Sequence, residues 1–529
     1  MQTRAALAEL ESQRSSFRAH IGRMSRALRT FEGRVAVVLS GGGARGAYEA
    51  GVLLAFQDAG LPTHIVAATS VGSINAASYA AHSTTLVGNA ESLVESWSQV
   101  TPPAMGIDWS RYIFMLAGLV AASAGLGNFL WLWLKRHGIY LHSNNPEHVM
   151  VAWLALMLAG VAILTFFDKL SYIAYVMKNL FRRRSWKPDA KKALTSIFGN
   201  VLVWGFVWIF LSSTHLHITS DRELRFELGT QFLTLALTLA GVAVWLMLRG
   251  KLSLWSHKFL RLPLRTGLFA NYERTKFLRH RIPVDALRAS PIRVVLTATD
   301  IQAGEGRYFT NASLDELMRD PHVNRGFVKA EMEQASDLMQ AIIASSAFTI
   351  AYEAVPIGGR LFTDGGIVTN QPIRPAVRLG ADVLFLVMVS PESNAPAEEV
   401  KTFLDVGVRA IDILITKNLK ADLKLLARVN RLCEIQAAGV GLPPEQVEVH
   451  LLDQQYRYVK AFTVCPAQPL AAAALDFDAS VTVPAILQGY RDGSRAALEY
   501  VQYAGGLPTA RSKRVIKLVP EAAAASAFS

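Results

Sequence analysis

Residues 35–46, VAVVLSGGGARG, place a glycine-rich loop directly after a short apolar run. A β-branched run bounded by glycine predicts a buried parallel strand over 35–39, and a helix is expected over 44–59. The loop therefore lies between a strand and the positive end of a helix, with several backbone N–H groups unshielded by side chains. Such a loop can hold either a phosphate or a developing oxyanion.

A second strand-to-helix turn follows. Residues 65–69 predict a strand and 73–81 a helix, so the pentapeptide ATSVG at 68–72 lies between them. A strained turn of this kind exposes a serine hydroxyl, here that of Ser70. The usual pattern is G-x-S-x-G, and Ala68 replaces its first glycine while Gly72 keeps the last. The alternative is that Ser70 caps the following helix.

The glycine loop also satisfies the G-x-G-x-x-G spacing of dinucleotide-binding proteins, which is a weak signal by itself. That interpretation needs an acidic residue at the end of the second strand, about 20 residues further on. The strand ends Ala67-Ala68-Thr69-Ser70 instead. A nicotinamide or flavin site is therefore disfavoured, and no cofactor is expected.

A third motif, Thr363-Asp364-Gly365-Gly366, lies far along the chain. A serine nucleophile needs a partner that takes its proton, and an aspartate followed by two glycines can approach another backbone closely. A structural Asp-Gly turn is the alternative. His450 would complete the chain order Ser, Asp, His of a hydrolase triad. It lies in an apolar strand pattern, however, which favours a structural role.

Together these motifs resemble the patatin-like phospholipase family, whose signature combines a G-x-G-x-x-G loop, a G-x-S-x-G elbow and a D-G-[AG] motif. The segments SGGGARGAYEAGVL at 40–53, ATSVGSINA at 68–76, TGLF at 266–269, IIASSAF at 342–348, TDGGIVTNQPI at 363–373 and LGADVLFLVMVS at 379–390 are also similar to that family. The resemblance covers about 34–108 and 266–390, and more weakly extends to about 500. It implies Ser70 as nucleophile, Asp364 as general base and no histidine. It further implies an oxyanion hole from the backbone N–H groups of Gly41, Gly42, Gly43, Ala44 and Val71, with Arg45, Gly46, Gly72, Gly365 and Gly366 as motif residues.

Strands alternate with helical stretches outside the middle of the chain. Further strands are expected at 292–297, 383–389, 448–452 and 462–465. This alternation predicts an α/β fold with a mostly parallel sheet covered on both faces. With the family resemblance, it becomes a three-layer α/β/α patatin-like domain in two parts, 34–108 and 266–505.

The intervening segment, 109–265, is strongly apolar. Transmembrane helices are predicted near 112–134, 149–167, 195–213 and 228–248, because runs of this length span the hydrocarbon core. Basic residues concentrate between the second and third spans and after the fourth, which indicates that the catalytic domain faces the cytoplasm. An even number of crossings also returns Asp364 to the side of the membrane that holds Ser70.

The chain of 529 residues has 54 Lys and Arg against 42 Asp and Glu, a net charge of +12, and only 2 Cys. A disulfide framework is excluded, and no metal-site spacing occurs. Because the basic residues form no continuous face, they fit anionic lipid better than nucleic acid. Residues 1–33 predict an amphipathic helix that lies either on lipid or on the protein's own domain. Residues 506–529 are expected to be a disordered tail.

The sequence thus predicts a multi-pass membrane protein that cleaves acyl esters of phospholipids or related lipids in the bilayer. A lipid-binding or scaffolding protein on a degenerate hydrolase domain is the first alternative, favoured only by Ala68. A transporter is disfavoured because the predicted spans carry almost no ionisable residues. The oligomeric state is open.

Overall fold

The computed structural model describes residues 2–22, 33–107, 117–118, 121, 158–160, 163, 269, 271–349, 351–391, 403–451, 454–471, 476–506 and 514–518. The chain divides into two compact units, 1–107 with 267–529, and 108–266. The predicted spans at 112–134, 149–167, 195–213 and 228–248 lie almost wholly outside the described residues. Within the ranges described, no helix is both long and apolar enough to cross a membrane. Every element named below belongs to the first unit.

A mostly parallel, nine-stranded sheet forms the centre of this unit. Its main path runs β11-β8-β1-β2-β3-β4-β5, with β7 beside β3 and β6 beside β7. The pairs β1/β2, β1/β8, β8/β11, β2/β3 and β4/β5 are parallel, whereas β3/β4, β3/β7 and β6/β7 are antiparallel. The expected α/β fold is therefore confirmed. The strands are β1 (Val35–Leu39), β2 (Ile65–Thr69), β3 (Arg293–Asp300), β4 (Glu305–Thr310), β5 (Met332–Glu333), β6 (Val355–Ile357), β7 (Arg360–Asp364), β8 (Val383–Val387) and β11 (Lys460–Val464).

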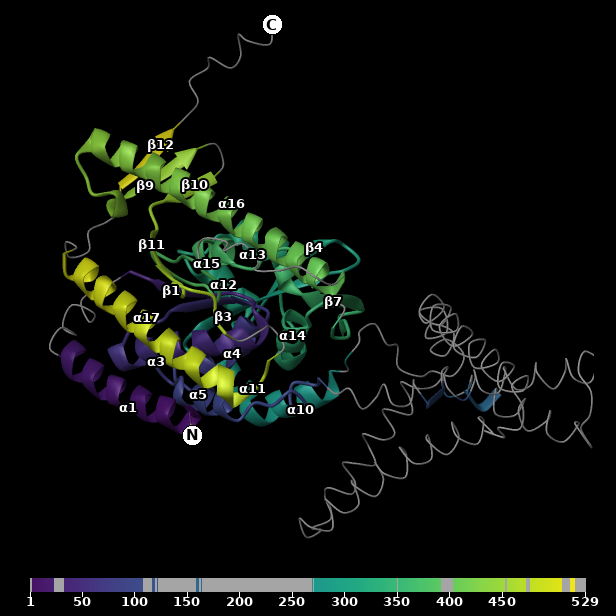
Figure 1. Cartoon of the computed structure of the whole chain (residues 1–529). Coiled ribbons are helices and arrows are strands. Elements are labelled where there is room, and N and C mark those ends of the chain that lie inside the picture. Colours follow the sequence, from purple (N-terminus) through teal and green to yellow (C-terminus); the bar gives the residue numbers. More distant parts are fainter. Residues whose placement is uncertain are drawn as a thin grey trace, which may run out of the picture. The chain divides into compact units, whose positions relative to one another are not determined.

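Apolar side chains fill both faces of this sheet. Alternate positions of β1, such as Ala36 and Val38, join one buried cluster with Leu317, Phe327 and Ile373, which lie on or beside the helices of that face. On the opposite face aromatic rings pack at an angle to one another, since the ring centroid of Phe385 lies 4.7 Å from that of Phe56 and 5.5 Å from that of Tyr500. The two buried faces give three layers of helix, sheet and helix (Figure 1). The helices are α1 (Gln2–Ile21), α3 (Ala47–Ala59), α4 (Val71–Ala81), α5 (Glu91–Ser98), α10 (Tyr272–Arg281), α11 (Val284–Ala289), α12 (Leu314–Arg319), α13 (Arg325–Glu331), α14 (Leu338–Ser345), α15 (Ile373–Arg378), α16 (Phe403–Val440) and α17 (Ala479–Gly506), with short 3-10 turns η1 (Gly43–Gly46), η3 (Gly365–Ile367) and η4 (Pro444–Gln446).

One predicted strand lies outside the central sheet. Residues 448–452 correspond to β9 (Val447–Leu451), which lies in a separate three-stranded sheet of order β10-β9-β12, with β10 at Gln454–Arg457. The strand β12 (Arg514–Leu518) falls in the stretch expected to be disordered and pairs in parallel with β9. An alternating apolar pattern predicts a strand but does not specify its partner. Here the inward side chains of β9 pack on Cys433 and Ala437 of α16 instead of the central sheet.

The N-terminal helix α1 packs against α3 and α17 (Figure 1). Its apolar residues Leu10, Phe17 and Ile21 are buried. Arg14 donates hydrogen bonds to both carboxylate oxygens of Asp58 on α3, at 2.9 and 3.2 Å. The helix predicted at 1–33 therefore packs on the protein's own domain, which is one of the two locations expected for it. Residues 23–32 of that prediction lie outside the described residues.

Candidate active site

Ser70 occupies a strained turn between β2 and α4. Its φ of 54° and ψ of −130° give it the one positive φ of any non-glycine residue in the described part of the chain. Such a conformation costs of order 1–3 kcal/mol and persists only where the surroundings enforce it. Gly72 helps to make the turn possible, because a Cβ there would lie 2.8 Å from the Ser40 carbonyl oxygen. Ala68 is fully buried in β2, paired with Leu39 and Leu296, so the extra methyl is accommodated by the strand.

The Ser70 hydroxyl meets Asp364, which is 294 residues further along the chain. Ser70 Oγ donates a 2.6 Å hydrogen bond to Asp364 Oδ2, and both residues are buried. The other carboxylate oxygen accepts the Gly366 N–H at 2.8 Å. Asp364 therefore forms an Asp-Gly turn and also accepts from the serine. Ser70 stands at the N-cap position of α4 but its side chain makes no capping bond, so the capping alternative is wrong.

Burial and hydrogen bonding act in opposite directions on the carboxyl of Asp364. Removal from water disfavours its charge and raises its pKa to about 6. The Ser70 hydroxyl, the Gly366 N–H and the positive charge of Arg274 each favour the ionised form and partly offset the rise. The result is a carboxylate that is ionised at neutral pH yet basic enough to accept a proton.

The glycine loop lies beside this pair. The Gly41 N–H donates to the side-chain oxygen of Asn370 at 3.0 Å, so this member of the predicted oxyanion hole has a protein acceptor. The N–H groups of Gly42, Gly43, Ala44 and Val71 lie before or in the first turns of η1 and α4, where backbone donors have no intrahelical acceptor. No acceptor is found for them among the described residues. They are therefore available to an oxyanion.

The loop is tightly confined by its neighbours. A Cβ on Gly41 would lie 2.5 Å from Asn370 Oδ1 and 2.8 Å from Ser70 Cβ. One on Gly42 would lie 2.3 Å from a methyl of Val389, and Gly43 has a φ of 60° that favours glycine. These contacts give a physical reason for three consecutive glycines. They also fix the loop against Ser70.

The remaining motif residues connect the loop to the elbow. The Gly46 carbonyl accepts a 2.8 Å hydrogen bond from Asn75 of α4, and its Cα lies against Val71. Arg45 donates to Ser390 Oγ at 3.3 Å. Gly365 permits a close approach to β3, because a Cβ would lie 2.3 Å from the Thr297 carbonyl oxygen. For Gly366 the nearest atom is Asp364 Oδ1, at 3.1 Å.

Several supporting residues were not identified by sequence reasoning. Ser345 Oγ accepts the backbone N–H of Ser70 at 3.2 Å, and Asn370 binds the loop as described above. Beneath the loop, the buried carboxylate of Glu49 accepts from Ser40 and Asn75, and burial raises its pKa to about 8. Ser345 and Asn370 lie in the segments IIASSAF and TDGGIVTNQPI that resemble the family. The family resemblance marks these two segments, but it does not predict which groups Ser345 and Asn370 contact.

His450 is not part of this site. It lies on β9 in the three-stranded sheet, whereas Ser70 and Asp364 are at the ends of strands in the central sheet. Its Nε2 is 3.9 Å from Glu448 Oε2. The triad alternative is therefore wrong. In the part of the chain that is described, no group of three or more His, Cys, Asp or Glu could hold a metal ion.

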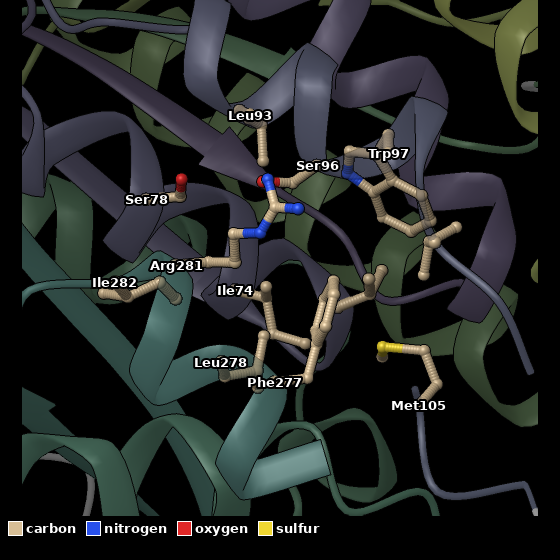
Figure 2. A pocket seen from close by; sticks show the side chains of 12 residues that line it. Ile74, Ser78, Leu93, Ser96, Trp97, Met105, Phe277, Leu278, Arg281 and Ile282 are labelled. Carbon is tan, nitrogen blue, oxygen red and sulfur yellow. The ribbon is translucent and has the colours of Figure 1, made fainter. Parts of the chain in front are cut away.

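A small apolar cavity of about 30 Å³ adjoins the elbow. Val71, the residue after Ser70, contributes to its wall together with Ile74 one turn further along α4. Figure 2 shows Leu93 and Trp97 from α5 on one side and Phe277 and Leu278 from α10 on another. The guanidinium of Arg281, also in the wall, donates to the Gln99 side chain at 2.6 Å. The cavity is therefore lined in part by the residue that follows Ser70 in the chain.

Parts of the chain are similar to known proteins. Lysophospholipase nte1 of Aspergillus terreus is 43% identical over 72 residues, which is 13% of this chain and 4% of that protein. VipD from Legionella pneumophila is 12% identical and aligns over 89% of this chain and 67% of its own, with a TM-score of 0.31, a likeness too low to support an argument. The profile of the patatin-like phospholipases matches residues 37–377, which is more than half of the chain. This chain belongs to the patatin-like phospholipase family, a family of lipid acyl hydrolases.

Proposed function

We propose that this protein is a membrane-bound serine hydrolase that cleaves fatty-acyl ester bonds of phospholipids or related lipids through a Ser70–Asp364 dyad. The 2.6 Å hydrogen bond between the Ser70 hydroxyl and the Asp364 carboxylate carries the proposal. A serine hydroxyl is a weak nucleophile unless a base accepts its proton. Asp364 is in contact with that proton, and free backbone donors lie alongside.

The reaction would proceed in two steps. As Ser70 Oγ attacks the ester carbonyl, its proton passes to Asp364, and the carbonyl oxygen becomes a tetrahedral oxyanion. Collapse of this intermediate breaks the ester bond, and Asp364 returns the proton to the departing alcohol. Water then attacks the acyl-enzyme, with Asp364 as base again, and releases the fatty acid while Ser70 recovers its proton. No histidine or cofactor takes part.

The backbone donors of the glycine loop and the elbow would stabilise the oxyanion. Gly42, Gly43, Ala44 and Val71 provide candidate N–H groups, and Gly41 contributes by holding the loop through Asn370. Loss of one oxyanion donor costs about 3–4 kcal/mol of transition-state stabilisation in comparable enzymes. Because these donors are backbone groups, their positions do not depend on side-chain rotamers, and the close contacts of Gly41 and Gly42 hold the loop in place.

The apolar cavity supports an acyl substrate. Its wall is continuous with the elbow through Val71, and its lining residues are mainly aliphatic or aromatic. We propose that carbons of the acyl chain near the scissile carbonyl occupy this space. At about 30 Å³ the cavity holds roughly two water-sized groups, so a longer chain must continue beyond it.

Residues 109–265 would hold the domain at its substrate. Their apolar runs and basic loops are the basis for proposing four membrane crossings with the catalytic domain on the cytoplasmic side. Attachment to the bilayer raises the effective concentration of a lipid substrate without changing the chemistry. The headgroup is not specified by these features.

The test is hydrolysis by the full-length protein in detergent or liposomes. Wild type, Ser70→Ala and a control, Ser98→Ala, are incubated with vesicles of mixed phospholipids, and released fatty acids and lysolipids are measured by mass spectrometry. Ser98 lies at the end of α5 and bonds only its own helix among the described residues. Release by wild type and Ser98→Ala but not by Ser70→Ala is expected. Equal release by all three would refute the proposal.

A further inference from the structure

A buried arginine lies behind the dyad. Arg274 on α10 is 1% exposed, although arginine is rarely so buried without a carboxylate partner. Its guanidinium instead donates to three uncharged acceptors: Asn271 Oδ1 at 2.7 Å, the Ile343 carbonyl at 3.1 Å and the Ser346 carbonyl. It also stacks 4.1 Å from the ring centroid of Tyr352, a favourable cation–π position.

Two of those acceptors are at the C-terminal end of α14. The last carbonyls of a helix have no intrahelical donor and carry the negative end of the helix dipole. A guanidinium can bind both carbonyls at once because its N–H groups form a rigid fork. Arg274 thus fixes the end of α14 by hydrogen bonds and by charge.

The same end of α14 holds both members of the dyad. Ser345 Oγ accepts the backbone N–H of Ser70 at 3.2 Å, and Ser345 also hydrogen-bonds Ser73 Oγ at 2.6 Å. Two residues later, the Ala347 carbonyl accepts the backbone N–H of Asp364 at 3.1 Å. The stretch 343–347 is therefore a bridge between nucleophile and base, and Arg274 is bound to it.

The position of Arg274 is itself fixed on several sides. Asn271, which accepts from Arg274, donates to the Glu353 carbonyl at 2.7 Å. Tyr352 donates its hydroxyl to the Met105 carbonyl at 2.8 Å. Residues from before and after the segment 108–266 thus meet at the ring on which Arg274 stacks. A shift of the guanidinium would disturb several contacts together.

Charge provides a second link to the dyad. The groups that act on the Asp364 carboxyl are the Ser70 hydroxyl, the Gly366 N–H and the charge of Arg274. The Thr299 hydroxyl contacts only the Asp364 backbone carbonyl. Among the described residues, Arg274 is thus the one charged group identified as acting on Asp364. Tyr352 and Glu353 lie near Arg274 itself.

We propose that Arg274 is a positioning residue of the dyad, which fixes the end of α14 that holds Ser70 and Asp364 and whose buried charge favours the ionised Asp364. The inference rests on the proposed function and adds to it a residue that no motif contains. Arg274 would act through its hydrogen-bonding geometry and through its charge, and different substitutions test these two effects separately.

The experiment compares Arg274→Lys, Arg274→Gln and Arg279→Met in the full-length protein, by the pH dependence of kcat/KM on a dispersed acyl ester. Lysine keeps the charge but loses the fork, whereas glutamine keeps hydrogen-bond donors but loses the charge. Arg279→Met is the matched control, because it removes an equal charge from the same helix. Arg279 is half-exposed and pairs with Asp337 at the other end of α14. Thermal unfolding identifies variants that are folded.

Arg274→Gln is expected to move the acid limb of kcat/KM upward by about one pH unit. Arg274→Lys should keep the limb but lower kcat about tenfold or more, since a small misplacement of reacting groups has large effects. Arg279→Met should change neither. An unshifted limb in folded Arg274→Gln, or equal kcat in folded Arg274→Lys and wild type, would overturn the inference. Failure of the proposed function is distinct, because hydrolysis by wild type would then persist in Ser70→Ala.

Discussion

Two buried aspartates at opposite ends of the central strands have opposite surroundings. Asp320 lies at the amino ends, where Arg34 precedes β1 and Arg293 opens β3. Both arginines form ion pairs with it, that of Arg34 at 2.9 Å, and the pKa of Asp320 lies well below its usual range. Asp364 lies at the carboxyl ends of β1 and β2, where its contacts are a hydroxyl and a backbone N–H, and burial raises its pKa to about 6.

The two carboxylates differ in whether a cation is in contact with them. Contact with two arginines stabilises the charge of Asp320 so strongly that it is a poor base. Asp364 makes no direct ion pair in the described part of the chain. Arg274 instead binds the end of α14, which in turn binds the backbone of Asp364. Its charge is therefore less stabilised than that of Asp320, as the proposed role of base for Ser70 requires. Burial without a direct cation does not by itself identify a catalytic carboxylate, because Glu49 is likewise buried with a raised pKa.

Asp364→Asn should have the largest effect on activity. An amide cannot accept the serine proton as a base, so kcat/KM is expected to fall by about 10⁴-fold. Because the carboxylate is destabilised by burial, its removal should also raise the free energy of unfolding at pH 7 by about 1–2 kcal/mol. Ester hydrolysis and denaturant unfolding measure the two effects. Retained activity in a folded variant would contradict the assignment of the base.

Asp320→Asn should behave in the opposite way. Removing its charge leaves Arg34 and Arg293 poorly compensated, and the free energy of unfolding should fall by about 2–3 kcal/mol. Hydrolysis per folded molecule should stay within about twofold of wild type, since this end of the sheet does not contact the dyad. A large loss of kcat without loss of stability would contradict a purely structural role for Asp320.

Sequence patterns predict the strands and turns at the site but not the contacts between distant segments. The elements β1, β2 and α4 follow from local patterns in which glycine and small residues permit close turns, whereas the helix expected over 44–59 divides into η1 and α3. The contacts of Asn370, Ser345 and Arg274 depend on residues brought together from distant parts of the chain, and no local spacing predicts them. The second sheet was missed for the same reason, because the pattern of β9 does not name β12 as its partner.

Gly41→Ala tests the carboxyl ends of the strands without altering a titratable group. The added methyl would lie 2.5 Å from Asn370 Oδ1 and 2.8 Å from Ser70 Cβ, so the loop or the elbow must move. We expect kcat to fall by about 10²-fold. Gly439→Ala in α16, whose Cβ would meet nothing within 4 Å, is the control and should leave kcat unchanged. Full activity of Gly41→Ala would show that the loop geometry is not required.

The pH dependence of hydrolysis tests the raised pKa of Asp364. The base must be ionised, and the pKa of Asp364 is raised to about 6, so kcat/KM should be constant above this pH and fall as pH decreases through it. Below the limb the loss should approach about tenfold per pH unit, as for one essential group. The measurement is the initial rate of ester hydrolysis from pH 4 to 9, in a range where wild type stays folded. A limb near pH 4 would indicate a base with an ordinary carboxyl pKa.

His450→Ala should have the smallest effect. The imidazole lies in the three-stranded sheet and its side chain is 34% exposed. Hydrolysis within about twofold of wild type is expected, because substitutions remote from the site are usually additive and small. The rate is measured with the same ester-hydrolysis assay. Loss of activity in a folded His450→Ala variant would restore the triad.

The most direct test of the central claim is covalent labelling of Ser70 by a fluorophosphonate. This reagent reacts with an activated serine without requiring the lipid substrate, and the site is mapped by peptide mass spectrometry. We predict that wild type is labelled at Ser70, and that the folded Asp364→Asn variant is labelled at a rate at least about 10²-fold lower, since general-base assistance contributes about that much or more. An unlabelled Ser70 in folded wild type, or equal labelling of the two proteins, would contradict the account.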